Sequence, residues 1–174
     1  MSTNLFVTLT NNVKTLVQAI SASVGAGDAN KIVATGADGR IDSTLMPTGL
    51  SADSKVVVAS EALSAGDFVN IHDVAGTANV RKASAVDATK PAHGFVANNF
   101  ASAASATVFF EGGNSAVSGR TAGVQYVLSN VTPGGSVAIG SFVPATGNIV
   151  QTLGVATSAT EINAEIDGSY VVIG

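Results

Sequence analysis

Two apolar spacings follow each other near the start of the chain. In the first, Leu5, Val7 and Leu9 alternate with polar residues, which predicts a short β-strand. In the second, apolar residues recur at i, i+3, i+4, i+7 and i+11, the spacing of one helix face; they are Val13, Leu16, Val17, Ile20 and Val24. We therefore predict one short amphipathic helix over about residues 12–24.

The residues around this segment suit the two ends of a helix. Asn11 or Asn12 is suited to the N-cap position, and Gly25 with Gly27 is suited to end the helix. A helix of about three turns is too short to be stable alone in water. Its apolar stripe is therefore expected to pack against the rest of the chain or against other copies of it.

The segment from Gly25 to Pro47 has the sequence GAGDANKIVATGADGRIDSTLMP. Glycines, aspartates and the final proline separate short apolar groups, which are Ile32, Val33, Ile41, Leu45 and Met46. This composition predicts an extended, turn-rich connector over residues 25–50 with little core of its own. Together with the strand and the helix, the connector forms an N-terminal arm of residues 1–50 that lies along another surface.

From about Ser54 the pattern changes to short β-rich runs separated by turn signals. The expected strands are Lys55–Ala59, Asp67–His72, Asn79–Ala83, Gly94–Ala97, Ala106–Glu111, Val124–Ser129, Ser136–Ile139, Asn148–Thr157, Glu161–Ile166 and Ser169–Ile173. The turn signals include Gly112-Gly113-Asn114 and Asp167-Gly168. This spacing predicts a mainly β protein, with a small β-barrel or β-sandwich over residues 51–174.

The sequence of this domain also contains an internal repeat. Gly66 precedes an apolar strand and is followed 28 residues later by Gly94 in the run HGFVA. Gly123 precedes a second apolar strand and is followed 31 residues later by Gly154 in the run LGVAT. Two such halves could together close one barrel, or the similarity could be a coincidence in a chain rich in small residues.

Charge is scarce, with 8 Lys and Arg, 12 Asp and Glu, and a net charge of −4. Nucleic-acid binding is disfavoured, because it needs a cationic face. Between Pro91 and Thr160, only Glu111 and Arg120 are charged. A lone domain usually covers itself with charge, so this stretch is either covered by partners and other copies or coated with neutral polar groups.

Several other classes of protein are excluded by what the sequence lacks. No apolar run approaches the ~20 residues of a membrane span, and the start has no basic region typical of a secretory signal. There are no cysteines, and the two histidines, His72 and His93, are far apart, which excludes disulfides and disfavours structural zinc. We therefore expect no cofactor and no metal site.

Candidate catalytic groups are equally scarce. His72 and Asp73 are neighbours on an expected strand and would point to opposite faces, so they do not converge. Two spaced carboxylate pairs, Glu161 with Glu165 and Asp38 with Asp42, lie beside polar turns without a partner. Asp28 and Asn30 begin like a calcium loop, but Ile32 stands where an oxygen ligand is needed. The expectation is a protein without enzymatic activity.

The segment from Gly25 to Pro47 resembles a connector found in virion proteins of tailed bacteriophages, in fibres and head decorations alike. The matching positions are Gly27 to Thr35, then Asp38 to Asp42, then Leu45 to Pro47. The runs SAGDFVNI and HGFVANNF and the glycine-rich turns are similar to the small β-barrel modules of capsid decoration (cement) proteins. The resemblance covers nearly the whole chain, and the connector is its specific part.

The resemblance implies a β-tulip-like domain and a homo-oligomer, usually a trimer, made in the host cytoplasm and located on the capsid surface of the virion. Such a protein binds the major capsid protein and bridges neighbouring capsomers, with no nucleic-acid or membrane partner. The residues expected to mediate self-association or capsid contact are Val13, Leu16, Val17, Ile20, Ile32, Val33, Ile41, Leu45 and Met46.

Two alternative functions remain open at this stage. A phage tail fibre or head-fibre component involved in host attachment could carry the same connector, and it would be expected to display aromatic residues on a loop. A carbohydrate-binding or enzymatic β-domain is the other alternative. Sugar-binding platforms use Trp or Tyr, and the chain has no Trp and only two Tyr, Tyr126 and Tyr170.

Overall fold

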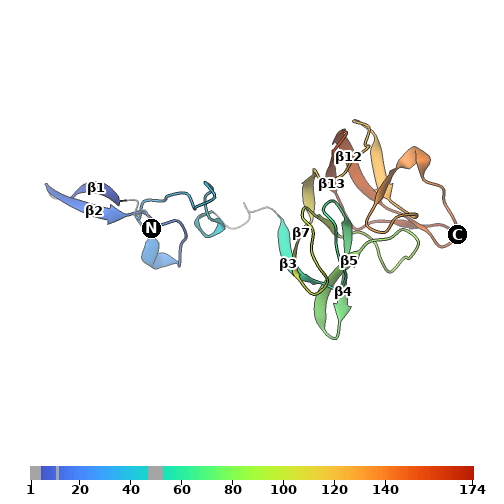
Figure 1. The fold of residues 1–174 in the computed structure, drawn as a ribbon, viewed down its shortest axis with the longest axis horizontal. Coiled ribbons are helices and arrows are strands. Elements are labelled where there is room, and N and C mark those ends of the chain that lie inside the picture. The colour runs from blue at the N-terminus through green and yellow to red at the C-terminus, as the bar shows by residue number, and fades with distance from the viewer. Residues whose placement is uncertain (1–4, 11, 47–52) are drawn as a thin grey trace. The chain divides into compact units, whose positions relative to one another are not determined.

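The computed structural model describes residues 5–10, 12–46 and 53–174, and it contains two compact units, Met1–Ser51 and Ala52–Gly174 (Figure 1). Asn11, Pro47 and the domain boundary expected between residues 50 and 51 lie outside the described residues.

The first unit is built on an antiparallel β-hairpin. Strand β1 (Leu5–Thr10) pairs with β2 (Val13–Gln18) over its whole length, from Leu5 opposite Gln18 to Thr10 opposite Val13. Asn12 lies in the connection with a φ of 63°, the left-handed conformation that tight hairpin turns require and that asparagine tolerates. The strand predicted from the alternation of Leu5, Val7 and Leu9 is confirmed.

The helix predicted over residues 12–24 is wrong, because Val13–Gln18 form strand β2. Val13, Thr15 and Val17 are β-branched, so these residues favour extended backbone and pair with the alternating strand before them. In a strand, side chains alternate between the two faces. Leu16 therefore lies on the opposite face of the hairpin from Val13 and Val17, and the predicted single stripe is divided between two faces.

The connector is turn-rich, as predicted, and it folds back on the end of the hairpin. It contains two 3-10 turns, η1 (Ala26–Asp28) and η2 (Ser43–Leu45). Ile20 forms a parallel β-bridge with Val33, in which the Ile20 N–H donates to Ile32 O at 2.9 Å. No residue of this unit is buried among those whose burial the structure describes, so these residues form no core.

The regular secondary structure of the second unit is almost entirely short strands. Those described are β3 (Ser54–Ala59), β4 (Phe68–Val74), β5 (Thr77–Lys82), β6 (Gly94–Val96), β7 (Ser105–Phe109), β8 (Glu111–Asn114), β9 (Gln125–Leu128), β10 (Ser136–Ala138), β11 (Ile149–Val150), β12 (Thr152–Ser158), β13 (Glu161–Glu165) and β14 (Val171–Val172). A 3-10 turn, η3 (Ile139–Ser141), follows β10. The segment Gly112-Gly113-Asn114, predicted as a turn, is part of β8, because it pairs with β13.

Five of these strands close a barrel in the order β3-β5-β4-β6-β7. Strand β3 closes it by pairing antiparallel with β7 and parallel with β5. Strands β8, β9, β10, β12 and β13 form an open sheet in the order β10-β9-β12-β13-β8, and β11 pairs separately with β14. Figure 1 shows the barrel strands β3, β4, β5 and β7 beside β12 and β13 of the sheet. The prediction of a mainly β protein with a small barrel is confirmed.

The internal repeat is confirmed by strand order and by register. The sheet order β10-β9-β12-β13-β8 repeats the barrel order β5-β4-β6-β7-β3. Val69 pairs with Gly94 in the barrel, and Tyr126 pairs with Gly154 at the equivalent positions of the sheet. The same hydrogen bond precedes each pair, from Gly66 N–H to Val96 O and from Gly123 N–H to Ala156 O, both at 2.8 Å.

Of the possibilities left open by the sequence, the two halves do not together close one barrel, because the first half closes a barrel by itself. Its interior holds a core cluster that includes Val69, Val96 and Val108. The equivalent residues of the second half are Tyr126, Ala156 and Ile162, and they belong to a different cluster together with Phe68 and Phe95 of the barrel strands. The second sheet thus packs against the barrel instead of closing on itself.

A buried glutamine joins the two halves. The Gln151 side chain is 0% exposed, accepts the Ala92 N–H at 2.6 Å and donates to Ala92 O at 2.9 Å. It therefore satisfies both backbone groups of Ala92 as a neighbouring strand would. A buried polar group costs stability unless it is hydrogen-bonded, so this contact fixes one arrangement of barrel and sheet.

Candidate functional site

Both faces of the β1–β2 hairpin carry exposed apolar side chains. Leu5, Val7, Leu9 and Leu16 share one face and are 50%, 65%, 65% and 67% exposed. An isolated two-stranded hairpin is at best marginally stable in water, and apolar patches of this kind on a soluble protein mark interaction sites. We define these four residues as the aliphatic face of the hairpin.

The opposite face of the hairpin carries two of the predicted contact residues. Val13 and Val17 lie there with Phe6, which pairs with Val17 across the strands. Val13 is 60% exposed and Phe6 is 42% exposed, whereas Val17 is half-buried. The predicted residues Val13, Leu16 and Val17 are therefore accessible, but they cannot form one contact surface because they lie on two faces.

The remaining predicted contact residues lie in the connector and beside the hairpin. Ile20, Ile32 and Leu45 are half-buried, and the other three are exposed, namely Val33 at 46%, Ile41 at 52% and Met46 at 40%. The bridge between Ile20 and Val33 brings two of these segments together. Leu16, Val17 and Ile20 also line a shallow hollow of about 650 Å³ in this unit.

Aspartates of the connector stabilise its turns through hydrogen bonds to nearby residues. Asp28 accepts the Val24 N–H at 2.7 Å and an ion pair from Lys31 at 2.6 Å, and these contacts, led by the Lys31 hydrogen bond, lower the pKa of its carboxyl. Asp42 accepts both the hydroxyl and the N–H of Thr44, and its pKa is lowered for that reason. Asp38 accepts the Arg40 N–H at 3.0 Å.

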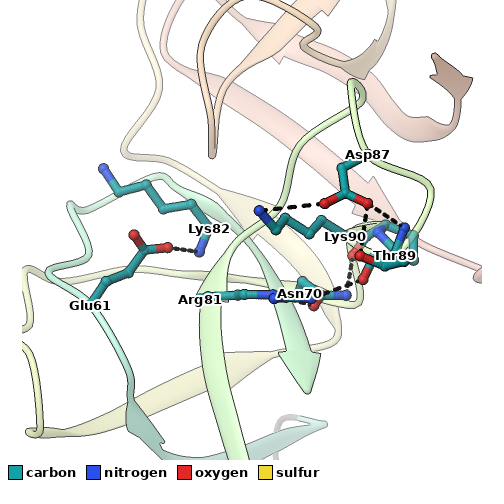
Figure 2. A network of polar contacts seen from close by, with 8 residues as sticks. Glu61, Asn70, Arg81, Lys82, Asp87, Thr89 and Lys90 are labelled. Carbon is teal, nitrogen blue, oxygen red and sulfur yellow. Dashed lines mark hydrogen bonds and ion pairs between the residues drawn. The ribbon is translucent and has the colours of Figure 1, made fainter. Parts of the chain in front are cut away.

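The second unit carries a polar network on the barrel strands β4 and β5 and the loop that follows them (Figure 2). The Arg81 guanidinium donates to Asn70 Oδ1 and to Thr89 O, both at 3.0 Å. Glu61 accepts the Lys82 N–H at 2.7 Å, and Lys90 lies 3.4 Å from Asp87. Sequence reasoning missed this network, because only tertiary structure brings residues 61, 70, 81 and 90 together.

The two histidines make different contacts in the barrel. His93 Nδ1 accepts the Ile71 N–H at 3.0 Å, and partial burial lowers its pKa. His72 lies on β4 with Nδ1 buried and unpaired. Within residues 5–10, 12–46 and 53–174, no group of three or more His, Asp or Glu side chains could hold a metal ion. None of the described helices is long and apolar enough to cross a membrane.

No protein-family model matches the chain, and no curated protein or solved structure is significantly similar to it. The candidate surfaces are therefore identified from the residues and contacts of this chain alone. The hairpin could have been recognised in the sequence, since Asn11 and Asn12 separate two runs rich in β-branched and apolar residues.

Proposed function

We propose that the protein is a structural component of a tailed-bacteriophage virion, without enzymatic activity, that binds the outer capsid surface as a homo-oligomer. It stabilises the shell by bridging neighbouring copies of the major capsid protein. The resemblance of the Gly25–Pro47 connector and of the β-domain supports this assignment, and the trimeric state is taken from the same resemblance.

The observation that carries the proposal is the exposed, two-faced apolar hairpin. Full burial of a Leu or Val side chain contributes about 1.5–3 kcal/mol. The four side chains of the aliphatic face are about half exposed or more, so roughly half of that contribution is still available from each. Contact with a partner would therefore stabilise the unit by on the order of 4 kcal/mol per copy.

The second unit supports a structural role through its surface. Between residues 91 and 160 its only charged side chains are Glu111 and Arg120. Arg120 is engaged in the fold, since it lies 5.0 Å from the centroid of the Tyr126 ring and donates to Ser136 O at 3.2 Å. The accessible surface of this region is therefore largely uncharged, which favours close contact with neighbouring subunits.

Co-sedimentation with capsids tests the proposal. Purified protein is mixed with phage heads stripped of it, and we expect saturable binding. The Val7→Lys/Leu16→Lys variant places two charges on the aliphatic face and is expected to lose binding. Val131→Lys is the matched control, because Val131 is 85% exposed and lies in the second unit. Failure of the unmodified protein to bind the heads would contradict the assignment to the capsid.

A further inference from the structure

A hollow of about 470 Å³ on the second unit collects an unusual share of its positive charge. Its lining includes Arg81, Lys82 and Lys90, which are three of the five Lys and Arg residues in that unit. His72, Ser60 and Ser84 add polar side chains to the same lining. We call this feature the basic hollow, and Figure 2 shows its charged residues.

Arg81 is the cation that the fold positions most firmly. Its Nε donates to Asn70 Oδ1 and one terminal nitrogen donates to Thr89 O, both at 3.0 Å. Asn70 is 1% exposed and is itself held by Pro91 O at 2.8 Å. Both acceptors of Arg81 are neutral, and no carboxylate forms an ion pair with Arg81 among the described residues. The second terminal nitrogen of the guanidinium, together with the remaining N–H of the first, can make a planar, two-point contact.

Three carboxylates, Glu61 in the lining of the hollow and Asp67 and Asp87 beside its lysines, each accept a backbone N–H. Asp87 accepts the Thr89 hydroxyl at 2.7 Å and the Thr89 N–H at 2.9 Å, which lowers the pKa of its carboxyl. Glu61 accepts the Lys82 N–H. Asp67 accepts the Ser64 N–H at 2.7 Å. Each carboxylate therefore has a structural role, because it holds the backbone of a nearby segment in place.

Lys90 is the more loosely paired of the two lysines. It lies 3.4 Å from Asp87 with the two side chains 37% and 36% exposed, whereas Lys82 lies 3.2 Å from Asp67 with the two side chains 28% and 15% exposed. Exposed ion pairs contribute little to stability, so the Lys90 ammonium can move toward an anion in the hollow at little cost. The Lys82 pair is more buried and is held more firmly.

An unpaired nitrogen lies on the same face as Arg81. His72 pairs with Asn79 across β4 and β5, and Arg81 is two residues from Asn79, so His72 and Arg81 are diagonal neighbours. The Nδ1 atom of His72 is buried without a hydrogen-bond partner. A buried polar atom without a partner calls for an explanation in a native fold.

We propose that the basic hollow binds a small oxyanion, a phosphate or carboxylate group, with Arg81 as the central contact. Lys90 supplies mobile positive charge, Lys82 adds a cation paired with Asp67, and His72 also lines the hollow. This function is separate from the proposed contact of the hairpin with capsid subunits, because it uses residues of the second unit alone.

Titration of the full chain with inorganic phosphate and, separately, with succinate tests the proposal, with sodium chloride keeping the ionic strength constant. Amide chemical shifts by NMR and the thermal unfolding midpoint are followed. We expect a saturable response to at least one of the two anions, with the largest shifts in residues 72, 81–84 and 87–90. Arg81→Gln is expected to weaken binding by about 10-fold or more, and Arg81→Lys by less.

Lys55→Gln is the matched control, because it removes one exposed positive charge of the same unit outside the hollow. If Arg81→Gln does not fold, Lys90→Gln provides the second variant, with a smaller expected loss of affinity. Equal responses to chloride, phosphate and succinate at one ionic strength would overturn the proposal. Equal affinities of Arg81→Gln and Lys55→Gln, or of Lys90→Gln and Lys55→Gln where Arg81→Gln does not fold, would overturn it as well. The comparison of phosphate with succinate identifies the preferred oxyanion.

Discussion

The two units of this chain are both made of short strands, yet they bury their apolar side chains to very different extents. Phe68, Leu153 and Ile162 of the second unit are 0% exposed, whereas Leu9 and Leu16 of the hairpin are 65% and 67% exposed. The difference lies in the number of layers. A barrel packed against a sheet supplies partners for both of its surfaces, while a single hairpin has neither face covered.

This difference indicates where each unit obtains its stability. The second unit is stabilised from within, by two core clusters and by the contact of Gln151 with Ala92. The first unit has hydrogen-bonded turns but no buried side chain among those described. Its ordering is therefore expected to depend on an outside partner, as the proposed virion function requires.

The largest expected effect is the loss of a central aromatic side chain. Phe68→Ala removes a fully buried ring that lies 6.4 Å from the Phe95 ring and is expected to lower the free energy of unfolding by about 3–5 kcal/mol. Leu16→Ala in the hairpin should change it by less than about 0.5 kcal/mol. Chemical denaturation measures both, and similar losses in the two variants would remove the distinction between the units.

A glycine required by close packing gives the next effect. A Cβ at Gly154 would overlap Asn163 O on the neighbouring strand, and its φ of 149° disfavours other residues. Gly154→Ala is expected to cost about 2–4 kcal/mol. Gly140→Ala is the control, since a Cβ there meets nothing within 4 Å. If the Gly154→Ala protein were as stable as the Gly140→Ala protein, the two strands would have to be less closely packed at Gly154 than the structure shows.

Gln151→Leu tests the contact between barrel and sheet. It leaves the N–H and C=O of Ala92 without partners, and the expected loss is about 1–3 kcal/mol in the free energy of unfolding. Gln125→Leu, at an exposed position of β9, is expected to be nearly neutral. Gain of stability in Gln151→Leu would contradict the role assigned to this side chain.

A smaller effect is expected from pH. Burial lowers the pKa of His93 in the folded state below its ordinary value of 6.5, so the unfolded chain binds the proton more readily. The contribution of His93 to stability is full above pH 6.5 and is lost as the pH falls below it. His93→Asn keeps a hydrogen-bond acceptor for the Ile71 N–H but does not titrate. Its unfolding midpoint should therefore fall less than that of the unmodified protein between pH 7 and pH 5.

Local patterns in the sequence predicted much of the second unit, because its strands alternate in the usual way and its turns contain glycine. The repeat around Gly66 and Gly123 was visible as well. What could not be predicted is that Tyr126 and Ile162 turn toward the barrel, since this depends on which surface covers them. The region around Val13 and Leu16 was mispredicted because a short apolar run fits both helical and strand spacings.

The hairpin surface and the network around Arg81 also differ in how far the sequence predicts them. The apolar contact residues were recognisable from composition, but their division between two hairpin faces follows from strand pairing. The network around Arg81 depends on Asn70, Thr89 and Glu61, which are separated by up to 28 residues in the chain and carry no motif.

Light scattering on the full chain and on residues 52–174 tests the central claim that the first unit mediates assembly. The second unit contains both core clusters and is expected to fold by itself. We predict that the full chain has the mass of an oligomer and that residues 52–174 have the mass of one chain. The same number of subunits in both proteins would contradict the account.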